Sequence, residues 1–119
     1  MGNSPLGRAV GAGTVMQVAM VVIGHFVPSL QQAGLFPIGG TLIGLVTGWL
    51  AGKGSPAGTN APTVARDGGI AGGVAGVLGS LVSTALGDVP LVNLTIAGGS
   101  TLVTGALGGL LARAMGKKA

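Results

Sequence analysis

The sequence predicts an all-α integral membrane protein, a four-helix bundle built from two repeated glycine-rich helical hairpins. Three observations support this fold class. Charged residues make up 7% of the 119 residues, against about 25% in ordinary soluble domains, so the chain cannot cover a soluble fold with a charged surface. Four apolar segments are long enough to cross a bilayer. Glycine supplies 26 residues and, in one segment, recurs at every fourth position.

The four predicted spans are separated by polar stretches. They cover about residues 9–27, 35–51, 69–86 and 91–112, and none contains Asp, Glu, Lys or Arg. At 1.5 Å per residue, a span of roughly 17–22 residues is about 26–33 Å long, which matches the hydrocarbon core of a bilayer. Residues 52–68 are predicted to form a polar cytoplasmic loop between the two hairpins. The whole chain is predicted to be a single transmembrane domain.

The basic residues predict the orientation of the spans. If all four segments cross, both termini and the 52–68 loop lie on one side of the membrane. Every basic residue falls on that side: Arg8, Lys53, Arg66, Arg113, Lys117 and Lys118. Because cytoplasmic segments are enriched in Lys and Arg, we expect both termini in the cytoplasm and the protein in a bacterial inner or viral membrane. The net charge of +4 therefore reflects topology, and nucleic acid is not an expected partner.

Stripes of small residues predict how the helices pack. The second span carries glycine at four-residue intervals, although each glycine costs a helix about 1 kcal/mol relative to alanine. In a bilayer such stripes let helix backbones approach closely, and this packing drives association. The predicted packing residues are Gly40, Gly44, Gly48, Gly52, Gly72, Gly76, Ser80, Thr101, Gly105 and Gly109. They are expected to contact helices of the same chain, copies of this chain or other membrane subunits.

The sequence contains an internal repeat. Residues 45–52, LVTGWLAG, resemble residues 102–109, LVTGALGG, at an offset of 57 residues. The same offset aligns the first span with the third. Because each unit holds two spans, both hairpins are predicted to have the same orientation, related by a pseudo-two-fold axis along the membrane normal.

Three polar side chains within the spans are candidate functional residues. Gln17 and His25 lie on nearly the same face of the first span, and Asn93 lies near the outer end of the fourth. His25 is expected to be a packing or interfacial residue, although histidine can also ligate a cofactor or gate a pore. No recognisable catalytic set accompanies them, and a chain without cysteine has no thiolate metal site. We therefore expect neither enzyme activity nor a resident cofactor or metal.

These features favour a structural or accessory subunit of a larger membrane assembly, held there by the glycine stripes. The alternative is a homo-oligomeric pore former such as a phage holin, because holins resemble this chain in small size, charge-poor spans and a basic C-terminus. A third class is a small solute transporter with its site between the repeats. Both alternatives need polar side chains along an aqueous path, and the spans offer few.

Overall fold

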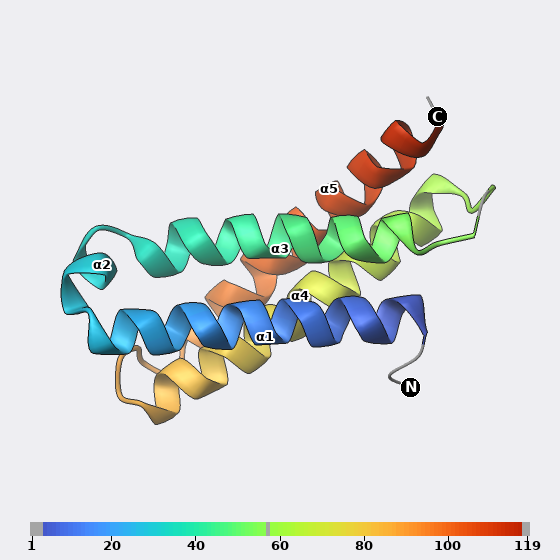
Figure 1. Ribbon diagram of the computed structural model, residues 1–119. Coiled ribbons are helices and arrows are strands. Elements are labelled where there is room, and N and C mark those ends of the chain that lie inside the picture. Colours follow the sequence, from blue (N-terminus) through green and yellow to red (C-terminus); the bar gives the residue numbers. More distant parts are fainter. Residues whose placement is uncertain (1–3, 57, 118–119) are drawn as a thin grey trace.

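The computed structural model describes residues 4–56 and 58–117, and over these residues it is all-helical (Figure 1). The helices are α1 (Pro5–Phe26), α2 (Pro28–Gln32), α3 (Leu35–Lys53), α4 (Ala61–Ala85) and α5 (Asn93–Lys117). Four of them hold candidate membrane spans: Leu6–Phe26, Leu35–Lys53, Ala61–Ala85 and Asn93–Met115. The all-α prediction and the number of long apolar helices are therefore confirmed.

Local sequence signals explain where several helices begin and turn. The Ser4 hydroxyl accepts a hydrogen bond from the Gly7 amide at 2.9 Å, and the Asn60 side chain accepts one from the Thr63 amide at 3.0 Å. Each is followed by a proline in the first helical turn, where the missing N–H costs nothing. Gly34, with a φ of 93°, makes the left-handed turn from α2 into α3.

The connection between α3 and α4 is shorter than the predicted loop of residues 52–68. α3 continues to Lys53, and α4 begins at Ala61, ahead of the predicted span that starts at residue 69. Arg66 and Asp67 predicted a loop for residues 61–68, but two charged residues do not prevent a helix. The capped first turns of α4 continue directly into its apolar part, and the candidate span includes them.

The bundle has two chemically different ends (Figure 1). The start of α1, the end of α3, the start of α4 and the end of α5 lie at one end. We name it the basic end because these segments contain Arg8, Lys53, Arg66 and Arg113. The other end, the turn end, holds α2 and the α4–α5 connection. The bundle measures 44 × 28 × 20 Å, and its long dimension is close to the full thickness of a bilayer of about 40–45 Å.

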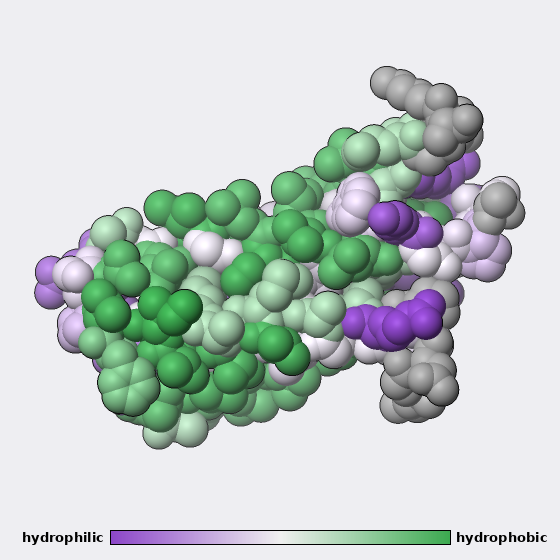
Figure 2. Space-filling view, viewed as in Figure 1, coloured by the Kyte–Doolittle hydropathy of each residue, from purple (hydrophilic) through white to green (hydrophobic). Residues whose placement is uncertain are grey.

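Small residues fill the interior, and large aliphatic side chains cover the outside. α4 is the most enclosed helix, with half of its apolar window buried against 22–33% in the other three. Its buried positions include Ala71, Gly72 and Ala75, whereas Val15, Leu42 and Val103 are exposed. Figure 2 shows hydrophobic residues over most of one face and hydrophilic residues toward its ends. This distribution is compatible with an integral membrane protein, whose surface meets lipid.

Candidate functional site

The predicted glycine stripes meet one another inside the bundle. A side chain at Gly48 of α3 would collide with the backbone of Gly105 in α5, and one at Gly52 would lie 2.7 Å from the Gly109 carbonyl oxygen. Gly44 faces Thr101, whose Cβ lies 3.1 Å from the position of an added Cβ. α3 and α5 therefore touch backbone to backbone at Gly48 and Gly52, whereas Gly44 meets the side chains of Thr101 and Thr104.

α4 joins the same contact through its own stripe. An added Cβ at Gly72 would lie 3.0 Å from the Gly105 Cα, and one at Gly76 would lie 2.9 Å from the Thr101 Cβ. Gly105 is thus enclosed by two helices at once. Gly40 packs differently, because its nearest atoms belong to Gln17 and Met20 of α1 at ordinary contact distances.

Two glycines outside the predicted set, Gly68 and Gly108, make equally close contacts with the backbone of another helix. A side chain at Gly68 would meet the Gly105 carbonyl, and one at Gly108 would meet the backbone of Leu45 and Trp49. Gly68 falls in the polar stretch before the predicted span, and Gly108 is out of register with the four-residue period. A search of the predicted spans for every glycine, and not only for glycines at four-residue intervals, would have included Gly108.

A cavity of about 240 Å³ lies among α1, α3, α4 and α5 in the half of the bundle toward the turn end. Most of its surface is apolar, and we name it the polar cavity after the polar side chains that line the rest. The Gln17 side chain, only 3% exposed, donates from Nε2 to the Gly40 carbonyl oxygen at 3.3 Å. Asn93 donates from Nδ2 to the Ser80 Oγ at 3.0 Å. The buried Ser83 hydroxyl also lines the cavity and has no hydrogen-bond partner among the described residues. The cavity thus brings Gln17, Ser80 and Asn93 together from three helices.

His25 lies outside this cavity, in a polar cluster at the turn end. Its Nδ1 lies 2.9 Å from Asp88 Oδ2, and because a carboxylate only accepts, Nδ1 is the donor. Gln31 donates from Nε2 to the other carboxylate oxygen at 3.1 Å and to the Gly24 carbonyl at 2.9 Å. The cluster ties α1 and α2 to the α4–α5 connection. Asp88 is distant in sequence and sits in a predicted turn, so no local signal identified it as the partner of His25.

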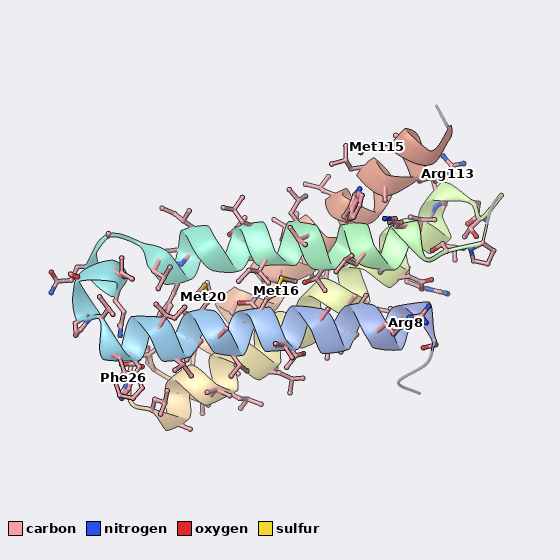
Figure 3. All side chains as sticks on the ribbon, in the orientation of Figure 1. Arg8, Met16, Met20, Phe26, Arg113 and Met115 are labelled. Atoms are coloured by element: carbon pink, nitrogen blue, oxygen red, sulfur yellow. The ribbon has the colours of Figure 1, made fainter. Side chains whose placement is uncertain are left out.

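A larger cavity of about 550 Å³ lies at the basic end, and we name it the basic cavity. Its lining includes Trp49, Lys53, Thr59, Ala112, Arg113 and Met115. Arg113 donates from Nε to the Thr59 carbonyl oxygen at 3.1 Å, and Lys53 Nζ lies 5.0 Å from the Trp49 ring centroid. Figure 3 places Arg113 and Met115 on α5 where it passes the α3–α4 connection.

Comparison with known proteins provides no relative. Neither a protein-family model, nor a curated protein, nor a solved structure matches the chain. Within the described residues, no group of three His, Cys, Asp or Glu side chains could hold a metal ion. The features that bear on function are therefore those of the molecule itself: an apolar exterior, a glycine-packed interior, a neutral polar cavity and a basic cavity.

Proposed function

We propose that this chain is a small integral membrane protein that acts as a structural or accessory subunit of a larger membrane assembly. The observation that carries this proposal is the apolar exterior of a bundle whose glycine stripes are already covered by its own helices. Large side chains are exposed on all four long helices, while the glycine stripes of α3, α4 and α5 are covered within the chain. Such an exterior suits contact with lipid and with neighbouring membrane helices.

The distribution of charge supports an orientation with both termini in the cytoplasm. Arg8, Lys53, Arg66 and Arg113 belong to the basic end, and the side chain of Asp88 lies at the other end. Segments rich in Lys and Arg are retained on the cytoplasmic side during insertion. The turn end then lies on the outer side of a bacterial inner or viral membrane.

The contacts between α3 and α5 support a duplicated hairpin. The repeat offset of 57 residues pairs Gly44 with Thr101, Gly48 with Gly105 and Gly52 with Gly109, and each of these pairs is in contact. Contact between equivalent positions is the signature of a two-fold axis, as in an isologous dimer interface. We place the pseudo-two-fold axis of the two hairpins between α3 and α5.

The outer helices depart from this symmetry for a reason visible in their sequences. α4 packs against α5, α3 and α1, whereas α1 packs against α3 and α4 but not α5. The repeat aligns Val15 of α1 with Gly72 of α4, and Ile23 with Ser80. Val15 and Ile23 are exposed, and their small counterparts are buried. Large side chains keep α1 at the periphery, where a partner can reach it.

The outer face of α1 is our proposed contact with other subunits. Gly11, Val15 and Ala19 follow one another at four-residue intervals and are all exposed, and a side chain at Gly11 would meet no atom within 4 Å. Gly11 and Ala19 on either side of Val15 are small, and small residues permit close approach of another helix. In this proposal the glycine stripes of α3, α4 and α5 hold the subunit together, and α1 provides the surface that contacts other subunits.

The alternative of a homo-oligomeric pore, such as a holin, receives less support from the geometry. The polar side chains of Gln17 and Asn93 hydrogen-bond inside the bundle, to Gly40 and Ser80. A pore formed between several copies would therefore be lined by aliphatic side chains. A pore would require the bundle to open and turn these groups outward.

Native mass spectrometry of the protein, extracted gently from its own membrane, tests the proposal. Co-extraction of different proteins at a fixed ratio is the expected result. A ring of identical chains that releases dye from liposomes would contradict the subunit proposal and support a pore former. A monomer alone in the mildest detergents would contradict both.

A further inference from the structure

We propose that the basic cavity binds the phosphate of an anionic phospholipid headgroup. This inference rests on the proposed insertion of the bundle in a membrane, and goes beyond the subunit role. At about 550 Å³, the cavity falls within the range of about 300–1,000 Å³ found for ligand sites. In the proposed orientation it opens at the cytoplasmic surface of the membrane, where anionic headgroups lie.

The charge of the cavity is positive and uncompensated. Lys53 and Arg113 both line it. The chain has two acidic side chains: Asp67 is paired with Arg66 at 3.1 Å, and Asp88 is bound to His25 at the turn end. Neither acid lines the cavity, so its two cations have no counter-ion among the residues that the structure describes, and a bound anion would supply one.

Arg113 is held in a position that suits a phosphate. Its Nε donates to the Thr59 carbonyl oxygen at 3.1 Å, which fixes the guanidinium against the α3–α4 connection. The two terminal nitrogens of the guanidinium remain available, and these are the donors that bind two phosphate oxygens at once. Lys53 adds a second positive charge from the end of α3.

The apolar part of the lining favours a lipid over a free anion. Trp49 and Met115 stand beside the two cations, and Met115 is exposed on the outside of α5. Tryptophan is typical of the membrane interface, where its ring meets both headgroup and acyl chain. A free phosphate would contact the cations alone, whereas a phospholipid would also place its glycerol and upper acyl chain along Met115. A zwitterionic lipid would bring its own cation toward Lys53 and Arg113, so the site favours an anionic headgroup.

The test is lipid binding by the full-length protein in detergent, followed by native mass spectrometry. The probes are phosphatidylglycerol and phosphatidylcholine with identical acyl chains. We expect retention of phosphatidylglycerol in preference to phosphatidylcholine. The double variant Lys53→Gln/Arg113→Gln should weaken phosphatidylglycerol binding by about 30-fold, because each cation near the headgroups contributes roughly a fivefold gain in binding.

Two further variants distinguish a site from general surface charge. Arg8→Gln/Arg66→Gln removes the same charge from the basic end outside the cavity and should keep the preference. Lys53→Arg/Arg113→Lys keeps the charge but removes the paired donors of the Arg113 guanidinium, so it should bind more weakly than the wild type and more tightly than Lys53→Gln/Arg113→Gln. Equal loss in the Arg8→Gln/Arg66→Gln variant, or equal binding of the two lipids by the wild type, would overturn the proposal.

Two additional measurements separate the possible causes of failure. Inorganic phosphate should not displace the lipid at millimolar concentration, and displacement would reassign the cavity to a free anion. Resistance to alkaline carbonate extraction measures membrane insertion without reference to lipid type. An inserted protein without lipid preference would contradict this inference alone, and an extractable protein would contradict the membrane proposal itself.

Discussion

Gly48 and Gly105 form the contact that tolerates least change. Any side chain at Gly48 would collide with the carbonyl group of Gly105, which is backbone and cannot rotate away. We predict that Gly48→Ala destabilises the bundle by about 1–3 kcal/mol, and Gly48→Leu by more. The measurement is the midpoint of unfolding of the purified protein in mixed micelles.

Gly11→Ala provides a matched control for that prediction. Gly11 is also a mid-helix glycine, but no atom lies within 4 Å of its added Cβ. Alanine there should be neutral or stabilising, because alanine is the better helix former by about 1 kcal/mol. Similar unfolding midpoints for the two variants would contradict the backbone contact between α3 and α5.

Asp88 is the residue on which the turn end depends. It accepts hydrogen bonds from His25 and Gln31, and its side chain is 13% exposed. Asp88→Ala leaves both donors without their acceptor, so we predict a loss of about 1–3 kcal/mol in unfolding free energy. Asp67→Ala is the control, because the Arg66 side chain of that pair is 67% exposed, and it should cost less than about 1 kcal/mol. Equal losses would show that the cluster does not hold the turn end together.

At the scale of helices, α1 and α4 are equivalent in the repeat but differ in position. We predict that Gly11→Leu and Ala19→Leu reduce association with partner subunits while leaving the unfolding midpoint unchanged, because both positions are exposed. Native mass spectrometry of gently extracted membranes measures the co-purified fraction. Gly99→Leu is the control, since Gly99 is equally open but lies on α5. If Gly99→Leu alone disrupted association, the contact would belong to α5.

Composition and periodicity predicted the elements well, and for simple reasons. Long apolar runs without charge have few other structures to adopt, so α1, α3, α4 and α5 could be placed from sequence. The start of α4 was harder to predict, because the charged residues Arg66 and Asp67 indicate a loop when only hydropathy is considered. Asn60 followed by Pro62 is a helix-start signal and gives the better boundary.

The sites were harder to predict than the helices. Gln17 and Asn93 could be picked out as polar groups in apolar segments, and Ser80 as a small packing residue, but their shared cavity depends on how three helices cross. The pairing of His25 with Asp88 depends on where the α4–α5 connection folds back. The basic cavity depends on Thr59, whose carbonyl group positions Arg113 and whose sequence context carries no signal.

At the scale of the whole molecule, the absence of cysteine permits a direct test of the helix arrangement. Thr41 of α3 and Ser100 of α5 line the polar cavity, and their hydroxyl oxygens are 3.5 Å apart. We predict that Thr41→Cys/Ser100→Cys forms a disulfide readily under mild oxidation, observed as faster migration on non-reducing gels. Thr41→Cys/Val103→Cys should not, because Val103 points outward from α5. Cross-linking of the second pair instead would mean that α5 has a different rotation.

We expect the glycine contact between α3 and α5 to act also as a pivot. Gly48 and Gly105 bring no side chain to this point, so a scissor-like swing of the two helices would be opposed by the neighbouring contacts of Gly44 with Thr101 and of Gly52 with Ala112. The polar cavity lies between α3 and α5 on one side of this pivot, and the basic cavity lies between the same helices on the other side. A swing that narrows one opening must widen the other. A disulfide between positions 41 and 100 would fix the distance between α3 and α5 at the polar cavity. A change in lipid binding at the basic cavity would then show that the two cavities are coupled through the movement of these helices.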